Sequence, residues 1–207
     1  MPTLDRIRDA LAAHEPTTVS DGESRRAAVA LVLREQAGAP EVLFIERATH
    51  PGDPWSGHMA FPGGRVDPED RSERHAAERE TLEEVGVDLA AAAPLGQLDD
   101  LQGHRVAGVP RLVVSAFVYH LPAPPPLAPN HEVQEAFWFP LGSLLDPERH
   151  VRYESGSREW RNFPGIVVGD PDRHVVWGLT YRFLEVFFQR VGRPLPDRWQ
   201  ELEAAAP

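Results

Sequence analysis

The spacing of hydrophobic residues predicts a short amphipathic helix near the start of the chain. Leu4, Ile7 and Leu11 recur at three- and four-residue intervals, which place them on one side of a helix. The predicted helix covers about residues 3–14 and ends before Pro16, because the residue that precedes a proline disfavours helical geometry. We expect its apolar side to pack on the rest of the fold.

Apolar runs rich in β-branched residues predict a sheet in the middle of the chain. The run at 111–120 is the longest and suits a central strand. Proline-rich residues 123–126 form a stiff connector that is too short to separate two domains. The predicted strands are 27–33, 42–45, 111–120 and 134–139, with a separator at 38–40 between the first two.

The last third of the chain predicts a hairpin followed by a helix. Strand-like runs at 163–168 and 174–177 flank residues 169–172, Gly-Asp-Pro-Asp, which favour a turn. Residues 178–190 carry apolar side chains at helical spacing, namely Leu179, Phe183, Val186 and Phe187. We interpret residues 1–207 as one domain, with the first helix and the segment from about 158 to 191 as additions to its core.

Composition excludes several classes of protein and leaves a globular enzyme open. The 207 residues include no cysteine, so disulfides and cysteine-ligated zinc sites are excluded, and we expect a cytoplasmic protein. No apolar run approaches the roughly 20 residues of a membrane span. The net charge of −11 argues against nucleic acid or an anionic membrane as a partner. A small phosphorylated substrate is compatible with it, since local metal ions and arginines reverse the field inside one cleft.

Three glutamates are the most informative chemical feature. Glu80, Glu83 and Glu84 lie at positions i, i+3 and i+4, so a helix brings them to one face. Crowded carboxylates repel each other unless a cation or a raised pKa relieves them. Mg²⁺ or Mn²⁺ is the expected cation because both prefer carboxylate oxygen. Taken alone, the run also fits a solvated helix face.

Independent signals predict a helix around these glutamates, from about Ser72 to about Val85. Asp70 and Glu73 have the spacing of a capping box, and Gly86 stands where a left-handed C-terminal cap is expected. Just upstream, in the sequence Phe-Pro-Gly-Gly at 61–64, an apolar strand stops at a predicted glycine turn whose backbone can approach a ligand closely. Strand, glycine turn and acidic helix therefore form one unit.

Residues 64–87 resemble the signature box of the Nudix hydrolases, since the core Arg-Glu-x-x-Glu-Glu-x-Gly is complete from Arg79 to Gly86. The chain departs from the common pattern in having Asp70 at a usual glutamate and one extra residue before Arg79. The resemblance implies an α/β fold, a Nudix-type α/β/α sandwich around a mixed β-sheet, and metal-dependent cleavage of a pyrophosphate. It implies metal ligands Glu80, Glu83, Glu84 and the Gly64 carbonyl, with Arg79 orienting a glutamate. Glu83 is our first choice as general base, and Glu132, otherwise a solvated loop carboxylate, is the alternative.

Flanking residues resemble the coenzyme A pyrophosphatase branch of that family. They are residues 43–47, Leu-Phe-Ile-Glu-Arg, then Gly57, and residues 177–180, Trp-Gly-Leu-Thr. The histidine expected in the upstream signature is missing, and His58, which we interpret as structural, stands nearby. The resemblance implies hydrolysis of coenzyme A or its thioesters to 3',5'-ADP and (acyl-)4'-phosphopantetheine. The candidate substrate-binding residues are Arg47, Arg65, Arg105 and Trp55.

Two other functions stay open on the sequence. Another nucleoside diphosphate derivative, such as NADH or ADP-ribose, shares the adenosine diphosphate element with coenzyme A. A non-catalytic nucleotide-binding module is compatible with the fold alone, although three crowded carboxylates have little use in a pure binder. The apolar side of the last helix belongs either to the core or to a homodimer surface, because periodicity does not separate the two.

Overall fold

The computed structural model describes residues 2–20, 22, 24–50, 55–103, 110–154 and 162–197. In these ranges the α-helices are α1 (Leu4–Ala12), α2 (Glu73–Val85) and α3 (Gly178–Arg190), and short 3-10 helices lie at Leu89–Ala91, Leu141–Leu145 and Pro147–Arg149. The strands are β1 (Arg25–Gln36), β2 (Ala39–Arg47), β3 (Met59–Ala60), β4 (Gly63–Arg65), β5 (Ala93–Gln97), β6 (Leu101–Gln102), β7 (Leu112–His120), β8 (Val133–Pro140), β9 (His150–Tyr153), β10 (Phe163–Val167) and β11 (Val175–Trp177).

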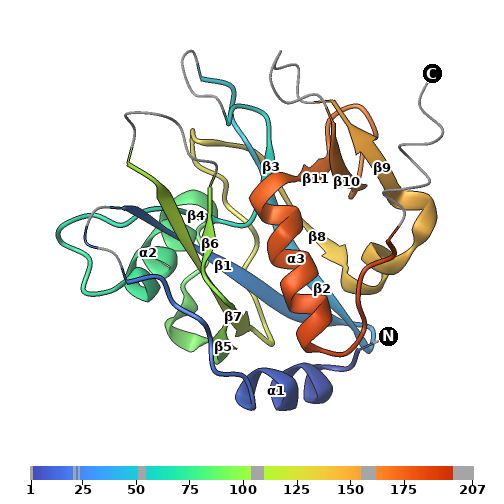
Figure 1. Cartoon of the computed structure of the whole chain (residues 1–207), viewed down its shortest axis with the longest axis horizontal. Helices are drawn as coiled ribbons and strands as arrows, with labels where there is room; N and C mark the ends of the chain where they lie inside the picture. Colours follow the sequence, from blue (N-terminus) through green and yellow to red (C-terminus); the bar gives the residue numbers. More distant parts are fainter. Residues whose placement is uncertain are drawn as a thin grey trace.

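The larger sheet is mixed and has β1 and β7 at its centre (Figure 1). Its order is β3-β2-β1-β7-β5, and β4, β6 and β8 pair with β1, β7 and β2 respectively. The parallel ladder between β1 and β7 runs from Arg25 opposite Leu112 to Leu33 opposite His120. The other pairs in this sheet are antiparallel. The predicted central strand at 111–120 is therefore confirmed as β7.

Helices cover both faces of this sheet, with α2 on one face and α1 and α3 on the other (Figure 1). Side chains alternate between the faces along each strand. Leu43 and Ile45 of β2 pack in the α2 layer, while Val42 and Phe44 pack in the layer of α1 and α3. This arrangement confirms the predicted α/β/α sandwich. Among the described residues, no helix is long and apolar enough to cross a membrane.

The predicted C-terminal hairpin and helix are present. Strands β10 and β11 pair antiparallel, with Gly165 opposite Trp177. They form a separate three-stranded sheet with β9, a strand that the sequence analysis did not predict. Helix α3 spans the predicted 178–190, and residues of α1 lie in the same apolar cluster as those of α3. The interpretation of these parts as additions to one domain stays a prediction.

Two local predictions around α2 were wrong. The cap of α2 is Ser72, whose hydroxyl accepts the His75 N–H, because Asp70 lies two residues too early and is engaged by Arg79 instead. Residues 63–64 form no turn: they belong to β4, which pairs with residues 28–29 of β1. The left-handed cap at Gly86 is confirmed, with φ of 71°.

A third correction concerns the first hairpin. Residues 39–40 begin β2, and the turn lies at Ala37 and Gly38, where φ is 50° and 79°. A two-residue turn with positive φ at both positions matches the twist of an antiparallel hairpin. Proline is tolerated at 40 because it stands near the start of a strand.

Candidate active site

Helix α2 directs two of its glutamates against β4. Glu84 is 1% exposed, and its Oε2 accepts the Gly63 N–H at 2.8 Å. Glu80 lies against the next residue, Gly64, so closely that a Cβ there would overlap its carboxylate. A side chain at 64 would therefore displace the Glu80 carboxylate, whereas one at 63 would meet the backbone of Ala28 and Val29. Pairing of β4 with β1 fixes this backbone beneath the helix.

Both glutamates are held where a negative charge is disfavoured. Burial raises the pKa of Glu84 from 4.5 to about 8, although the hydrogen bond from Gly63 works in the opposite direction. Burial also raises the pKa of Glu80, and Arg79 opposes that shift. Neighbouring carboxylates raise both pKa values further. A cation placed between the two carboxylates would reverse this effect.

Arg79 organises the acidic side of α2. Its Nη1 donates to Glu80 Oε1 at 3.0 Å and to Glu83 Oε2 at 3.1 Å. Its Nε and Nη2 donate to the two oxygens of Asp70 at 3.1 and 2.9 Å, and Nη2 also reaches the Arg65 carbonyl at 3.2 Å. Arg79 holds the pKa of the buried Asp70 carboxyl well below its usual range. The planar guanidinium thus ties the loop before α2 to two glutamates.

A loop carboxylate joins the helix at this point. Single oxygens of Glu80, Glu84 and Glu132 all lie within 4.8 Å of one another. Glu83, by contrast, is exposed and turned toward Arg79, so it stands outside this group of three. Our interpretation of Glu132 as a solvated loop carboxylate was therefore incomplete: the side chain is exposed, but it belongs to the acidic cluster.

Backbone contacts explain why Glu132 arrives there. The Ala128 and Asn130 N–H groups donate to the last carbonyls of α2, at Val85 and Glu84, both at 2.9 Å. Helix termini leave such carbonyls without intrahelical partners, so the loop satisfies them. The Asn130 side chain then accepts the Glu132 N–H at 2.8 Å, and the Glu132 carbonyl accepts the Ala48 N–H at 2.8 Å. The loop is docked on α2 and β2 together.

The donor set of Glu80, Glu84 and Glu132 fits a hard divalent cation. Carboxylate oxygens are the ligands that Mg²⁺ and Mn²⁺ prefer. Glu84 is almost fully and Glu80 partly desolvated, and their pKa values stay raised although Arg47 and Arg79 oppose the shifts. The cluster therefore suits a cation that arrives from solution.

The candidate substrate-binding residues lie at different distances from this cluster. Arg47, at the end of β2, has its Nη1 3.9 Å from Glu84 Oε1. Arg65, at the end of β4, has an exposed side chain. Trp55 is 50% exposed and contacts the His58 ring edge-on, with centroids 6.0 Å apart. Arg105 lies outside the described residues.

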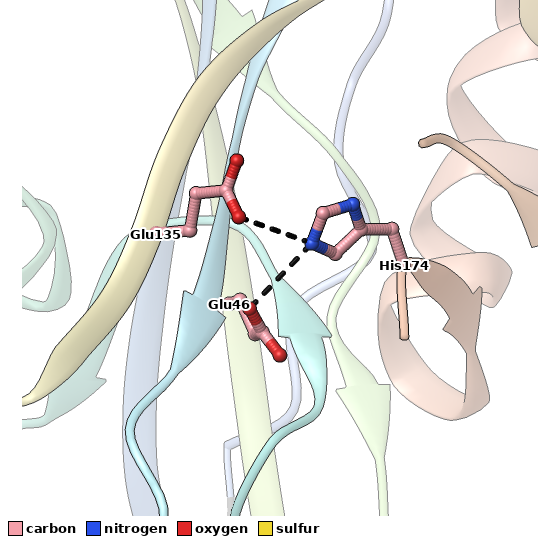
Figure 2. Close-up of side chains that lie close together, drawn as sticks. All are labelled: Glu46, Glu135 and His174. Atoms are coloured by element: carbon pink, nitrogen blue, oxygen red, sulfur yellow. Dashed lines mark ion pairs between the residues drawn. The ribbon is translucent and has the colours of Figure 1, made fainter. Parts of the chain in front are cut away.

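A second carboxylate cluster lies on the other face of the sheet (Figure 2). Glu46 and Glu135 stand opposite each other on β2 and β8, and their side chains meet His174 from the turn before β11. His174 Nε2 is 3.5 Å from Glu46 and 3.3 Å from Glu135. Arg173 Nη2 donates to both glutamates. Sequence reasoning missed this cluster because its members lie up to 128 residues apart.

The hydrogen bonds of His174 assign this second cluster to protein structure. Its Nδ1 accepts the Asp170 N–H at 3.1 Å, so the neutral ring carries its proton on Nε2, which faces the carboxylates. A metal bound at Nε2 requires the opposite tautomer. Because Arg173 also supplies a positive charge, we interpret this group as a polar lock between the two sheets. We name Glu46, Glu135, Arg173 and His174 the polar lock.

Comparison with known sequences identifies relatives of the chain. A family model described as NUDIX domain matches residues 24–160. The human mitochondrial coenzyme A diphosphatase NUDT8 is 33% identical over 166 residues, which cover 79% of this chain and 68% of the relative. An uncharacterised Schizosaccharomyces pombe protein, C14C4.10c, is 36% identical over 162 residues, 69% of this chain. The chain spans about half the length of that yeast relative, at 49%.

Solved structures agree with the observed fold. A MutT/nudix family protein from Enterococcus faecalis matches with a TM-score of 0.56 at 19% identity, over 92% of this chain and 70% of that one. RenU, a Nudix hydrolase from M. smegmatis, has a TM-score of 0.50 at 23% identity, over 61% of this chain and 76% of that one. At these identities the likeness concerns the fold alone. The family-model match over residues 24–160 and the relative at 33% identity show that the protein belongs to the Nudix hydrolases and is a pyrophosphohydrolase.

Proposed function

We propose that this enzyme hydrolyses the pyrophosphate of coenzyme A or its thioesters to 3',5'-ADP and (acyl-)4'-phosphopantetheine, with Mg²⁺ or Mn²⁺ bound. The observation that carries the proposal is the cluster of Glu80, Glu84 and Glu132 beside Arg47. The similarity to human and mouse mitochondrial coenzyme A diphosphatase NUDT8, at 33% and 30% identity, supports the choice of substrate.

The metal ligands in this proposal are Glu80 and Glu84 of α2, Glu132 of the docked loop and the Gly64 carbonyl. A bound divalent cation supplies charge neutralisation of the pyrophosphate and acidifies a coordinated water. The chain holds its carboxylates ready for this role: Arg79 fixes Glu80, and the Gly63 N–H fixes Glu84. Preorganised ligands avoid the cost of ordering side chains when the substrate binds.

The proposed general base is Glu83, with Glu132 as the competing residue. Glu83 is exposed and hydrogen-bonded to Arg79, so its carboxylate is accessible to water. Glu132 is also exposed but shares its site with two further carboxylates. A general base must reach the attacking water in the complex with substrate, which favours an accessible carboxylate that is not occupied by metal.

Arg47 and Arg65 are proposed to bind the phosphate groups of the substrate. The Arg47 guanidinium lies beside Glu84 and therefore at the edge of the proposed metal site. Arg65 extends from β4, directly after Gly64, and its carbonyl contacts Arg79. A guanidinium pairs with phosphate oxygens through parallel hydrogen bonds, which makes these two residues suitable for a pyrophosphate.

The test is an assay of the purified protein with coenzyme A, acetyl-coenzyme A, NADH and ADP-ribose, each with Mg²⁺ and with Mn²⁺, analysed by LC-MS. We expect 3',5'-ADP and 4'-phosphopantetheine from coenzyme A. Survival of coenzyme A while NADH or ADP-ribose is cleaved would refute the proposed substrate but not the reaction class.

A pair of variants, Glu83→Gln and Glu132→Gln, separates the two candidates for the general base. Loss of the base should lower kcat strongly and change KM little. Glu69→Gln, an exposed carboxylate before α2, is the matched control.

Three further proposals come from the sequence and need their own measurements. We propose a single domain, a cytoplasmic location and, as an open alternative, a homodimer. Cell fractionation checks the location, and light scattering after size exclusion checks the oligomeric state. The proposed partner is a small nucleoside diphosphate derivative rather than nucleic acid or membrane, which the substrate assay addresses.

A further inference from the structure

A row of aromatic rings runs from the small sheet to the loop before β3. Trp177 of β11 stacks on Tyr153 of β9, with ring centroids 4.7 Å apart and planes inclined by 22°. Phe163 of β10 lies 5.0 Å from the same indole. On the other side, His58 contacts Trp177 edge-on at 4.7 Å, and Trp55 contacts His58 at 6.0 Å. We name these five residues the aromatic row.

Strand pairing explains why the rings gather on one face of the small sheet. Gly165 is opposite Trp177 on one side and opposite Val151 on the other, and Phe163 is opposite Tyr153. A side chain at 165 would collide with Val175 and crowd Tyr153, so the missing side chain makes room for the neighbouring rings. The alternate residues Ile166 and Val176 point into the main core, so the row occupies the face directed away from it.

The row is more enclosed at its centre than at its end. Trp177 is contacted by three rings, and these contacts hold it in place. The large side chain at the end, Trp55, is 50% exposed, whereas large apolar side chains are usually buried. An exposed indole supported by a fixed row offers a surface for a planar partner.

The end of the row is joined to the candidate active site through Arg47. The Arg47 N–H donates to the His58 carbonyl at 3.1 Å, and the Arg47 carbonyl accepts the Gly57 N–H at 3.0 Å. The side chain of Arg47 lies 3.9 Å from Glu84. Two backbone hydrogen bonds therefore connect the loop that carries Trp55 and His58 to the residue beside the acidic cluster.

The polar lock fixes the two ends of this connection. Glu46 directly precedes Arg47 on β2, and His174 directly precedes β11, whose last residue is Trp177. Contacts of Glu46 with Arg173 and His174 therefore hold the small sheet against the strand that presents Arg47. The aromatic row and the acidic cluster are carried on one connected frame.

We propose that the aromatic row binds the planar base of the nucleotide substrate, with Trp55 as the stacking residue and the polar lock as its positioning group. This inference rests on the proposed function, since a base joined to the pyrophosphate through a ribose is what brings a ring to this place. Stacking is suited to the recognition because every base has an aromatic face, and the contact needs no hydrogen-bond partner. The proposal assigns selectivity among substrates to the small sheet of β9, β10 and β11, which lies outside the signature box.

The decisive probes are AMP and ribose 5-phosphate, which differ only by the base. We expect the wild-type protein, with Mg²⁺, to bind AMP more tightly in calorimetry, and Trp55→Leu to lose about 10-fold of that preference. Affinity for ribose 5-phosphate should stay unchanged. Trp138→Leu, which removes a partly buried tryptophan of β8 outside the row, is the matched control and should retain the preference.

A second measurement tests the positioning role. His174→Asn should raise KM for adenine-containing substrates more than it lowers kcat, whereas a general loss of folding would lower the active fraction and therefore kcat. Equal binding of AMP and ribose 5-phosphate by the wild type, or an unchanged preference in Trp55→Leu, would overturn the inference. Because binding is measured without turnover, a preference that depends on Trp55 supports the inference even where the coenzyme A assay fails.

Discussion

The two carboxylate clusters lie on opposite faces of one sheet and differ in what stands beside the acids. In the cluster of Glu80, Glu84 and Glu132, burial and mutual repulsion raise the pKa values of both helix glutamates. In the polar lock, Glu46 and Glu135 meet the Arg173 guanidinium and the His174 Nε2–H group. In the first cluster these pKa values stay raised although Arg79 contacts Glu80 and Arg47 lies beside Glu84, whereas in the second a single arginine contacts both acids.

This difference teaches that the number of carboxylates does not define a cation site. Both clusters contain glutamates from separate elements, and both bring single donor atoms within 4.8 Å. The decisive features are the neighbouring donors and the tautomer that they impose on histidine. Where an arginine and a histidine N–H contact both acids, the cluster joins elements together. Where burial keeps the pKa values raised despite neighbouring arginines, the cluster suits an external ion.

The largest expected difference between the clusters is in catalysis. Glu84→Gln should lower kcat/KM for the preferred substrate by about 1000-fold, because it removes a charge that the proposed site uses directly. Glu46→Gln should change kcat much less, since the Glu46 carboxylate contacts no reacting group. Steady-state kinetics, with circular dichroism to confirm folding, make the comparison. Similar losses of kcat in the two folded variants would contradict the distinction between a catalytic and a structural cluster.

The next effect is stabilisation by metal. At about 100 times its dissociation constant, a ligand adds about 2.7 kcal/mol, which for a protein of this size corresponds to roughly 5–10 °C in melting temperature. We expect Mn²⁺ to produce such a shift in the wild type and in the Glu46→Gln variant. The shift should vanish in the Glu80→Gln/Glu84→Gln double variant. Calorimetric melting with and without EDTA measures it, and a shift lost with Glu46 instead would reverse the assignment.

The smallest effect is a pH dependence of the metal-free protein. Because the pKa of Glu84 is about 8 when folded and 4.5 ordinarily, the folded state binds more protons than the unfolded state between these values. Its contribution to stability is therefore present below about pH 4.5 and is lost as pH rises toward 8. In EDTA, the melting temperature of the wild type should fall relative to Glu84→Gln between pH 5 and 8. A difference in melting temperature that does not change with pH would contradict the raised pKa of Glu84.

Sequence patterns predicted the parts of the site that are local in the chain. Helical spacing placed Glu80 and Glu84 on α2, and Gly86 marked its end. The same spacing grouped Glu83 with them, yet its side chain pairs with Arg79 of the same helix. The third member of the cluster, Glu132, comes from a loop outside the helix. Periodicity therefore predicts the helix and its acidic side, but it does not tell which carboxylates come together in the folded protein.

The missing parts depend on pairing between distant segments. Glu132 reaches the cluster because its loop caps α2 and bonds to Ala48, and neither contact has a signature in the residues around 132. Likewise, Glu46 meets Glu135 only through the register of β2 with β8. Strand β9 was not predicted because it has only four residues, His-Val-Arg-Tyr, and an alternation this short does not stand out in the sequence. Register is a property of the folded sheet and has no local code.

The parallel ladder of β1 and β7 has a consequence for the newly synthesised chain. Its partners lie 87 positions apart, as for Arg25 and Leu112, and helix α2 lies wholly within the segment that this pairing closes. Distant pairing of this kind forms slowly, since the entropy of loop closure is lost before contacts compensate for it. The third carboxylate, Glu132, is translated later still. We therefore expect a ribosome-bound fragment that ends before Glu132 to lack a complete acidic cluster, so that translation itself delays the appearance of hydrolytic activity.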